Sequence, residues 1–198
     1  MADTRELHAA LVRSTEGFLN LFVNRSSEYN SIKAHLRKSD TIILSELEVY
    51  HGASKNLRLS VKATRRAIKN AIIQCHYYPG RGELYITESR EAEFERDISA
   101  LEIQWEYFKD CYVEVDTSTL KLRAMLKTFP EALALLNEVQ IERTQAYEEI
   151  AGNVLSYVTE SKHILNYSII IIPDQPVEAS SSQGSSSHHH HRNRHHHR

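Results

Sequence analysis

The chain is poor in residues that interrupt helices, with only six glycines and four prolines among 198 residues. Four of these ten residues lie at positions 79, 80, 82 and 130. A chain with so few turn formers runs long distances without reversing direction. The scarcity therefore predicts long elements separated by few turns, and a length of 198 residues fits one folded domain.

Cysteine and long apolar runs are scarce as well. The only cysteines are Cys75 and Cys111, and the longest aliphatic run, at 169–172, is far shorter than the ~20 residues of a membrane-spanning helix. The N-terminal stretch MADTRELHAALVRS has no apolar run of signal-peptide length. We therefore expect a cytoplasmic or nuclear protein in which both cysteines are small core residues rather than a disulfide bridge.

Motifs of catalysis and cofactor binding are absent from the sequence. It has no phosphate-binding loop, no G-x-S-x-G, no C-x-x-C and no G-x-G-x-x-G. We therefore expect a protein that is not an enzyme and that holds no cofactor.

Apolar residues at steps of three and four run through most of the chain. This spacing is typical of helices that pack along a seam. The seam is most regular at Phe94, Ile98, Leu101, Trp105, Phe108, Tyr112, Val115, Thr119, Leu122, Leu126 and Phe129. Similar seams run through 43–75 and 11–36, and the second of these has the polar residue Arg25 at a seam position. A looser seam runs through 133–164, with polar Gln140 and Arg143 at seam positions. The pattern predicts an all-α, elongated protein with coiled-coil-type packing.

Three turns are expected, near 37–40, 77–87 and 128–131. The first is the weakest, because no glycine or proline lies between Gly17 and Gly52. Two architectures are therefore open: an antiparallel bundle of four helices, or a longer hairpin in which 1–76 folds against 88–170. In both, 1–172 forms the helical domain and 173–198 is a disordered tail rich in serine and histidine.

The segment 55–71 contains six basic residues and no acidic one. Their spacing places them on one helical face beside the seam, and we call them the basic stripe: Lys55, Arg58, Lys62, Arg65, Arg66 and Lys69.

Two hypotheses explain the stripe. If the chain reverses near residue 82, the stripe lies opposite 95–109, and its basic residues set the register by pairing with Glu95, Asp97, Glu102 and Glu106. Alternatively, the stripe binds an anionic membrane, at ~1 kcal/mol per basic residue. Nucleic acid is disfavoured, because the acidic segments 83–116 and 131–160 would repel phosphates.

Two Glu-x-x-His pairs, Glu48–His51 and Glu160–His163, resemble ligands of a di-iron site in a four-helix bundle. The expected turns place the two pairs ~24 Å apart along the bundle, so they cannot share metal ions. We therefore expect solvated side chains and no metal site. The seven histidines within 188–198 are interpreted as low-complexity sequence with incidental metal affinity.

These observations favour a non-catalytic helical scaffold or adaptor. It would act through helix-mediated oligomerisation or complex assembly, with a protein partner or a second copy. The alternatives are a peripheral membrane-binding rod that uses the basic stripe and, more distantly, a metal-binding four-helix-bundle enzyme.

Overall fold

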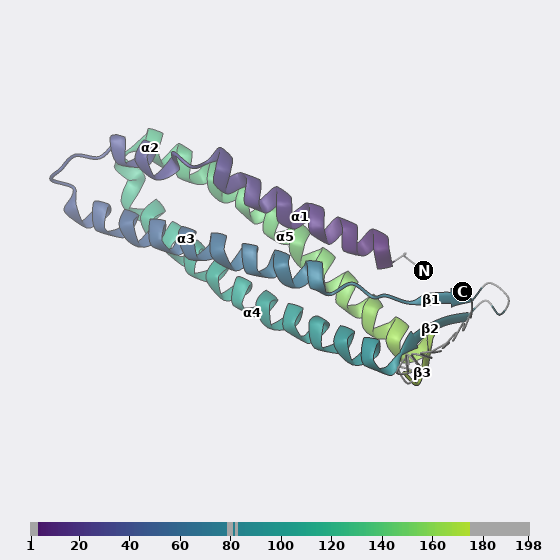
Figure 1. Ribbon diagram of the computed structural model, residues 1–198. Coiled ribbons are helices and arrows are strands. Elements are labelled where there is room, and N and C mark those ends of the chain that lie inside the picture. Colours follow the sequence, from purple (N-terminus) through teal and green to yellow (C-terminus); the bar gives the residue numbers. More distant parts are fainter. Residues whose placement is uncertain (1–3, 79–80, 82, 175–198) are drawn as a thin grey trace, which may run out of the picture.

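The periodic apolar positions become the core of an elongated antiparallel helical bundle (Figure 1). The computed structural model describes residues 4–78, 81 and 83–174. Its helices are α1 (Thr4–Asn24), α2 (Glu28–Ala34), α3 (Thr41–Asn70), α4 (Glu88–Met125) and α5 (Pro130–Tyr167). At 1.5 Å per residue, the 38-residue helices α4 and α5 are each ~57 Å long. The all-α bundle is thus confirmed, and the loop at 35–40 between α2 and α3 makes it a bundle rather than a two-segment hairpin.

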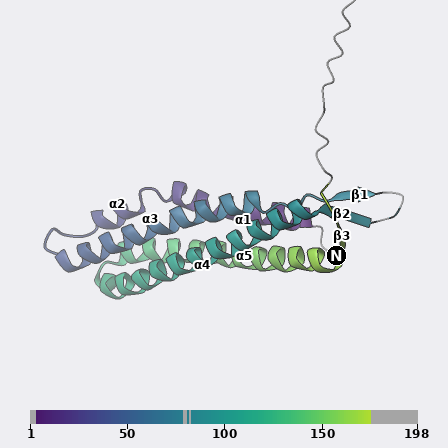
Figure 2. The ribbon, with the colours of Figure 1, turned by 60° about the horizontal axis from the view of Figure 1, so that its bottom comes forward.

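The four long helices form a square arrangement. α3 packs against α4, α4 against α5, α5 against α1, and α1 against α3. The turned view in Figure 2 shows the same long helices side by side, with α2 continuing the direction of α1.

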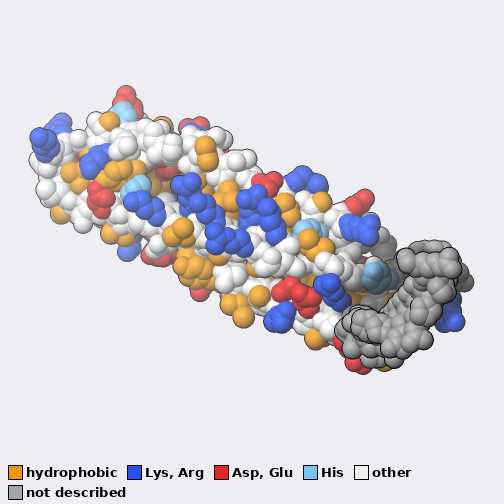
Figure 3. Space-filling model, viewed as in Figure 1, with side chains coloured by type: hydrophobic (Ala, Val, Ile, Leu, Met, Phe, Trp, Pro, Cys, Tyr) orange, Lys and Arg blue, Asp and Glu red, His pale blue; other side chains and the backbone are white. Residues whose placement is uncertain are grey.

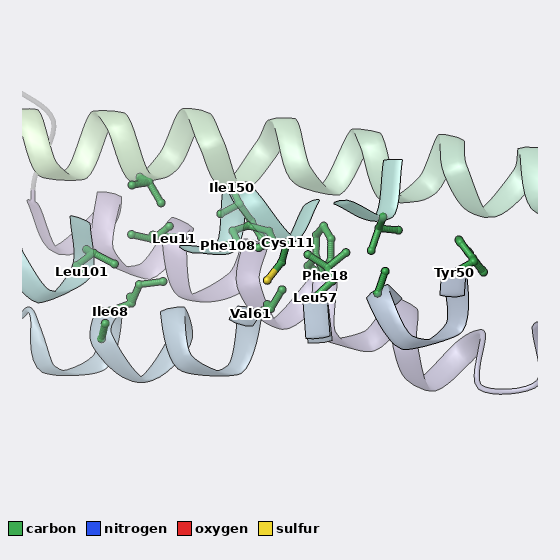
Figure 4. Packing of buried hydrophobic residues seen from close by; sticks show 14 of the residues in the cluster. Leu11, Phe18, Tyr50, Leu57, Val61, Ile68, Leu101, Phe108, Cys111 and Ile150 are labelled. Atoms are coloured by element: carbon green, nitrogen blue, oxygen red, sulfur yellow. The ribbon is translucent and has the colours of Figure 1, made fainter. Parts of the chain in front are cut away.

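Seam residues fill the space between the helices. Figure 4 shows Leu57 and Val61 of α3 together with Phe108 of α4 and Phe18 of α1, all of them fully buried. Cys111 also lies in this core, whereas Cys75, which was expected there too, is only half-buried in the segment between α3 and β1. Both cysteines are free thiols. The seam spacing therefore identified the residues that hold the bundle together.

One helix break was not predicted. The first seam reads continuously through residues 11–36, yet α1 ends at Asn24 and α2 begins at Glu28. The intervening segment, which includes Ser26 and Ser27, has serines whose side chains compete with helical backbone hydrogen bonds. The break opens a gap beside α3 that becomes a cleft, described below.

Three short strands were not predicted either. β1 (His76–Tyr78) and β2 (Glu83–Thr87) pair antiparallel where a loop over 77–87 was expected. β3 (Ile169–Ile172) pairs parallel with β2, in the register Leu84 to Ile169. Isoleucine favours strands because its branched side chain packs well on a pleated surface. The strands close one end of the bundle (Figure 1).

Candidate functional site

The basic stripe lies on the outer surface of α3. Arg65 is half-buried, and the other five side chains are exposed. Figure 3 shows Lys and Arg side chains gathered along α3 in the middle of the molecule, with further basic groups over α1. The row from Lys55 to Lys69 extends ~21 Å along the helix.

The predicted pairing of the stripe with α4 is wrong. Within the described residues, no stripe side chain forms an ion pair with Glu95, Asp97, Glu102 or Glu106. Instead, Glu102 pairs with Lys162 and Glu106 with Lys109. Within the described residues, the stripe forms its ion pair through Arg65, with Glu16 of α1.

The geometry of α3 explains this outcome. The Thr64 hydroxyl donates to the Gln104 carbonyl oxygen at 3.3 Å, so α4 packs against the flank of α3 that carries Thr64. Arg65 lies on the opposite flank, next to α1. The register itself is close to the predicted one, because Ser118 of α4 donates to Glu46 of α3, as an alignment centred on residue 82 requires, and Thr64 meets Gln104 about one turn from its expected partner. Lys55, Arg58, Lys62, Arg66 and Lys69 therefore have no ion pair in the described part of the chain.

A cleft of about 180 Å³ opens at one end of the stripe, and we call it the junction cleft. It lies where the chain leaves α1 and enters α2, and α3 and α5 complete its walls. Its lining combines apolar residues with charged ones: Phe18, Leu21, Phe22, Arg25, Ser26, Glu28, Tyr29, Tyr50, His51, Ser54, Lys55, Arg58, Val139, Glu142 and Arg143. Two stripe residues, Lys55 and Arg58, are therefore shared with the cleft.

A buried arginine on α5 organises the base of the cleft. Arg143 is only 6% exposed. Its Nη1 donates to the Tyr50 hydroxyl at 3.1 Å, and its Nη2 donates to Thr119 Oγ1 at 2.9 Å. Tyr50 in turn donates to the Glu28 carboxylate. This chain of contacts compensates the buried guanidinium and links α2, α3, α4 and α5.

Burial shifts the acidity of these groups. Desolvation raises the pKa of Glu28, although the hydrogen bond from Tyr50 and the charge of Arg143 oppose that change. Burial raises the pKa of Tyr50 to about 12, so its hydroxyl stays protonated and can donate to Glu28. Desolvation also lowers the pKa of His51, and the neighbouring Lys55 lowers it further.

The other polar seam residues also find partners inside the bundle. Arg25 donates through Nε to Glu142 at 3.0 Å and through Nη2 to Glu138 at 2.8 Å. The hydrogen bond from Arg25 holds the pKa of Glu142 below its usual value. The Gln140 amide donates to Asp116 at 3.2 Å. These side chains therefore fix the packing of α5 against α1 and α4.

The two Glu-x-x-His pairs lie in different surroundings. Glu48 accepts a hydrogen bond from Tyr29, whose ring stacks on His51 with centroids 4.3 Å apart. His163 contacts the ring of Tyr167 near the far end of α5. Across residues 4–78, 81 and 83–174, no group of three or more His, Cys, Asp or Glu side chains is arranged to hold a metal ion.

Sequence reasoning did not identify the cleft, because its shape depends on the helix break. One signal was available: Arg143 occupies a seam position, and a buried charge requires a partner. Tyr50 and, through it, Glu28 supply that partner, and Glu28 is the first residue of α2, directly after the break. The interpretation of the tail concerns residues that, apart from Pro173 and Asp174, lie outside the described ranges.

None of the described helices combines the length and apolar character that crossing a lipid bilayer requires. The chain was also compared with known proteins. No family model, no curated protein and no solved structure matches it.

Proposed function

We propose that the protein is a non-catalytic helical scaffold that associates peripherally with an anionic membrane surface through the basic stripe. The observation that carries the proposal is the exposure of Lys55, Arg58, Lys62, Arg66 and Lys69 without ion pairs in the described chain. A basic row that is not neutralised within the protein is free to neutralise an acidic surface outside it.

The energetics suit reversible binding. Each basic residue near an acidic leaflet contributes about 1 kcal/mol, so five exposed residues contribute about 5 kcal/mol. Leu59 lies among these basic residues and is 61% exposed, which adds an apolar contact with the interface. Because the basic residues share one face of the single helix α3, the whole row can reach a bilayer together.

Sedimentation with vesicles tests the proposal. The variant Lys62→Glu/Arg66→Glu/Lys69→Glu reverses three stripe residues that do not line the junction cleft. Its matched control, Lys38→Glu/Lys121→Glu/Lys127→Glu, makes the same net charge change at exposed positions outside the stripe. We expect the stripe variant to bind phosphatidylserine vesicles about a hundredfold more weakly, because three contributions of ~1 kcal/mol are lost.

The control variant should retain most of the binding of the parent protein, and both variants should keep its helical circular dichroism. Binding should weaken as salt rises, because the Debye length falls from ~10 Å at 0.1 M to ~3 Å at 1 M. Equal loss in the two variants, or no loss in the stripe variant, would refute a role for the stripe.

Self-association is the second candidate function, and an apolar row on the outer face of α4 favours it. Ile103, Tyr107, Val113 and Leu120 are each between 50% and 66% exposed. A second copy that packs against this row would bury it and assemble the scaffold through its helices. Light scattering should then show a dimer in the parent and a monomer in Ile103→Gln/Val113→Gln, whereas Leu155→Gln, on the exposed face of α5, should stay dimeric. A monomeric parent at high concentration would exclude this candidate.

A further inference from the structure

The junction cleft has one apolar wall. Phe18, Leu21 and Phe22 of α1 form it, together with Val139 of α5. Phe18 is fully buried and supports this wall from behind, whereas Leu21 and Phe22 are half-buried and remain accessible from the cleft. A wall of this kind removes a short hydrocarbon chain or a ring from water.

The opposite side of the cleft carries an unbalanced positive charge. Of the two carboxylates in the lining, Glu142 is paired with Arg25, and Glu28 is linked to Arg143 through the Tyr50 hydroxyl. Lys55 and Arg58 remain, and neither has a carboxylate partner within the described residues. The cleft therefore attracts an anion to the side formed by α3.

A hydroxyl group in the same wall is also unsatisfied. Ser54 Oγ is buried and has no hydrogen-bond partner in the part of the chain that the structure describes. Buried polar groups are normally paired, so an unpaired one in a cleft wall indicates an atom that completes it from outside. Ser54 directly precedes Lys55 and lies one helical turn before Arg58, so a bound anion can accept from all three side chains.

We propose that the junction cleft binds a small amphipathic anion, a carboxylate that bears a short aliphatic chain or a single ring. Its carboxylate lies against Ser54, Lys55 and Arg58, and its apolar part lies against Leu21 and Phe22. The cleft volume of about 180 Å³ slightly exceeds the roughly 150 Å³ of an apolar cavity that holds benzene, so an acid of about six carbons suits the site. This site goes beyond the membrane association proposed above, since its apolar wall and its base lie outside the stripe.

Binding of hexanoate, measured by calorimetry and by ligand-observed NMR on the full chain, tests the proposal. Hexanol and hexylamine serve as neutral and cationic probes of similar size. Hexanoate should bind at least tenfold more tightly than either, because only its carboxylate is complementary to Lys55 and Arg58. Equal binding of the three probes, or no saturable binding of hexanoate up to about 10 mM, would overturn the proposal.

Matched variants locate the site. Lys55→Gln/Arg58→Gln should weaken hexanoate binding about tenfold or more, whereas Lys62→Gln/Arg66→Gln, further along the same helix, should leave it unchanged. Ser54→Phe should abolish binding because its ring fills the cleft, and Ser54→Ala should retain an open cleft with weaker binding. Retained affinity in a folded Ser54→Phe protein would place the ligand elsewhere and refute the assignment.

The same variants separate this site from the membrane surface. A folded Ser54→Phe protein should still sediment with anionic vesicles, because the exposed stripe is intact. The triple stripe variant at positions 62, 66 and 69 should lose the vesicles but keep hexanoate. Loss of hexanoate binding in that triple variant would contradict a separate cleft site.

Discussion

Arg143 provides the most demanding test of the packing around the junction cleft. We predict that Arg143→Met, which keeps an unbranched stem but removes the guanidinium group and its charge, destabilises the bundle. The substitution deletes the donors to the Tyr50 hydroxyl at 3.1 Å and to Thr119 Oγ1 at 2.9 Å. It also removes the positive charge that helps to keep the half-buried Glu28 ionised.

The magnitude follows from opposing contributions. Hydrogen bonds to a charged group contribute about 1.5–3 kcal/mol each, so the two bonds amount to about 3–6 kcal/mol. The variant no longer has to bury a charged guanidinium group, and this saving in desolvation free energy offsets part of the loss. We expect the free energy of unfolding to fall by about 3 kcal/mol. At 2–4 °C per kcal/mol for a chain of this size, the melting temperature falls by about 6–12 °C.

Urea and thermal unfolding at pH 7, followed by circular dichroism, measure the effect. Arg123→Met, at an exposed arginine of α4, should stay within about 0.5 kcal/mol of the parent protein. Glu28→Gln should recover part of the loss when it is added to Arg143→Met, because no unpaired charge then remains near the base of the cleft. The coupling free energy between the two substitutions should exceed about 1 kcal/mol. An Arg143→Met protein as stable as the parent, or strict additivity with Glu28→Gln, would refute the account of this network.

Three further predictions concern individual side chains. Burial raises the pKa of Glu28, so the folded state binds this proton more tightly than the unfolded state does. The stability of the parent relative to Glu28→Gln should therefore be greatest at acid pH and fall as the pH rises through the folded-state pKa, as unfolding titrations across pH 4–8 would reveal. Leu101→Ala should cost about 2–5 kcal/mol in urea unfolding because it leaves a core cavity, whereas Leu120→Ala, at a half-exposed site, should cost little. Tyr157→Phe removes the hydrogen bond to the Ala71 carbonyl oxygen just beyond α3 and should cost about 1 kcal/mol, with amide hydrogen exchange increasing at that helix end.

The sequence predicted the parts of the fold that depend on local periodicity. The seam of α4 is an example, because residues such as Phe94, Leu101 and Leu122 are buried where steps of three and four place them. The start of α5 at Pro130 is another, since proline fits the first turn of a helix. Both features depend on residues that are close together in the chain, so they can be predicted from the local sequence.

Local periodicity does not show which neighbouring helix packs against each side of a given helix. The basic stripe lies beside its seam as predicted, but Arg65 reaches Glu16 of α1 rather than an acidic residue of α4. Whether α1 or α4 covers that flank depends on the direction in which the bundle winds, and seam spacing is the same for both hands. The cleft was missed for a related reason, because the break between Asn24 and Glu28 has neither glycine nor proline to mark it.

The position of β3, which pairs with β2 at one end of the bundle, has a mechanical consequence. β3 follows α5, and it lies at the same end of the rod as Thr4, the first residue of α1 (Figures 1 and 2). A force applied between residues 4 and 172 therefore acts on one end of the bundle. It separates α1 from α3 and α5 one turn at a time, whereas force applied at opposite ends would shear all the turns together. Because only a few contacts resist at any moment, a protein held by these two points should extend gradually at low force. A protein held through the loop at 35–40 and β3 should resist as a single unit.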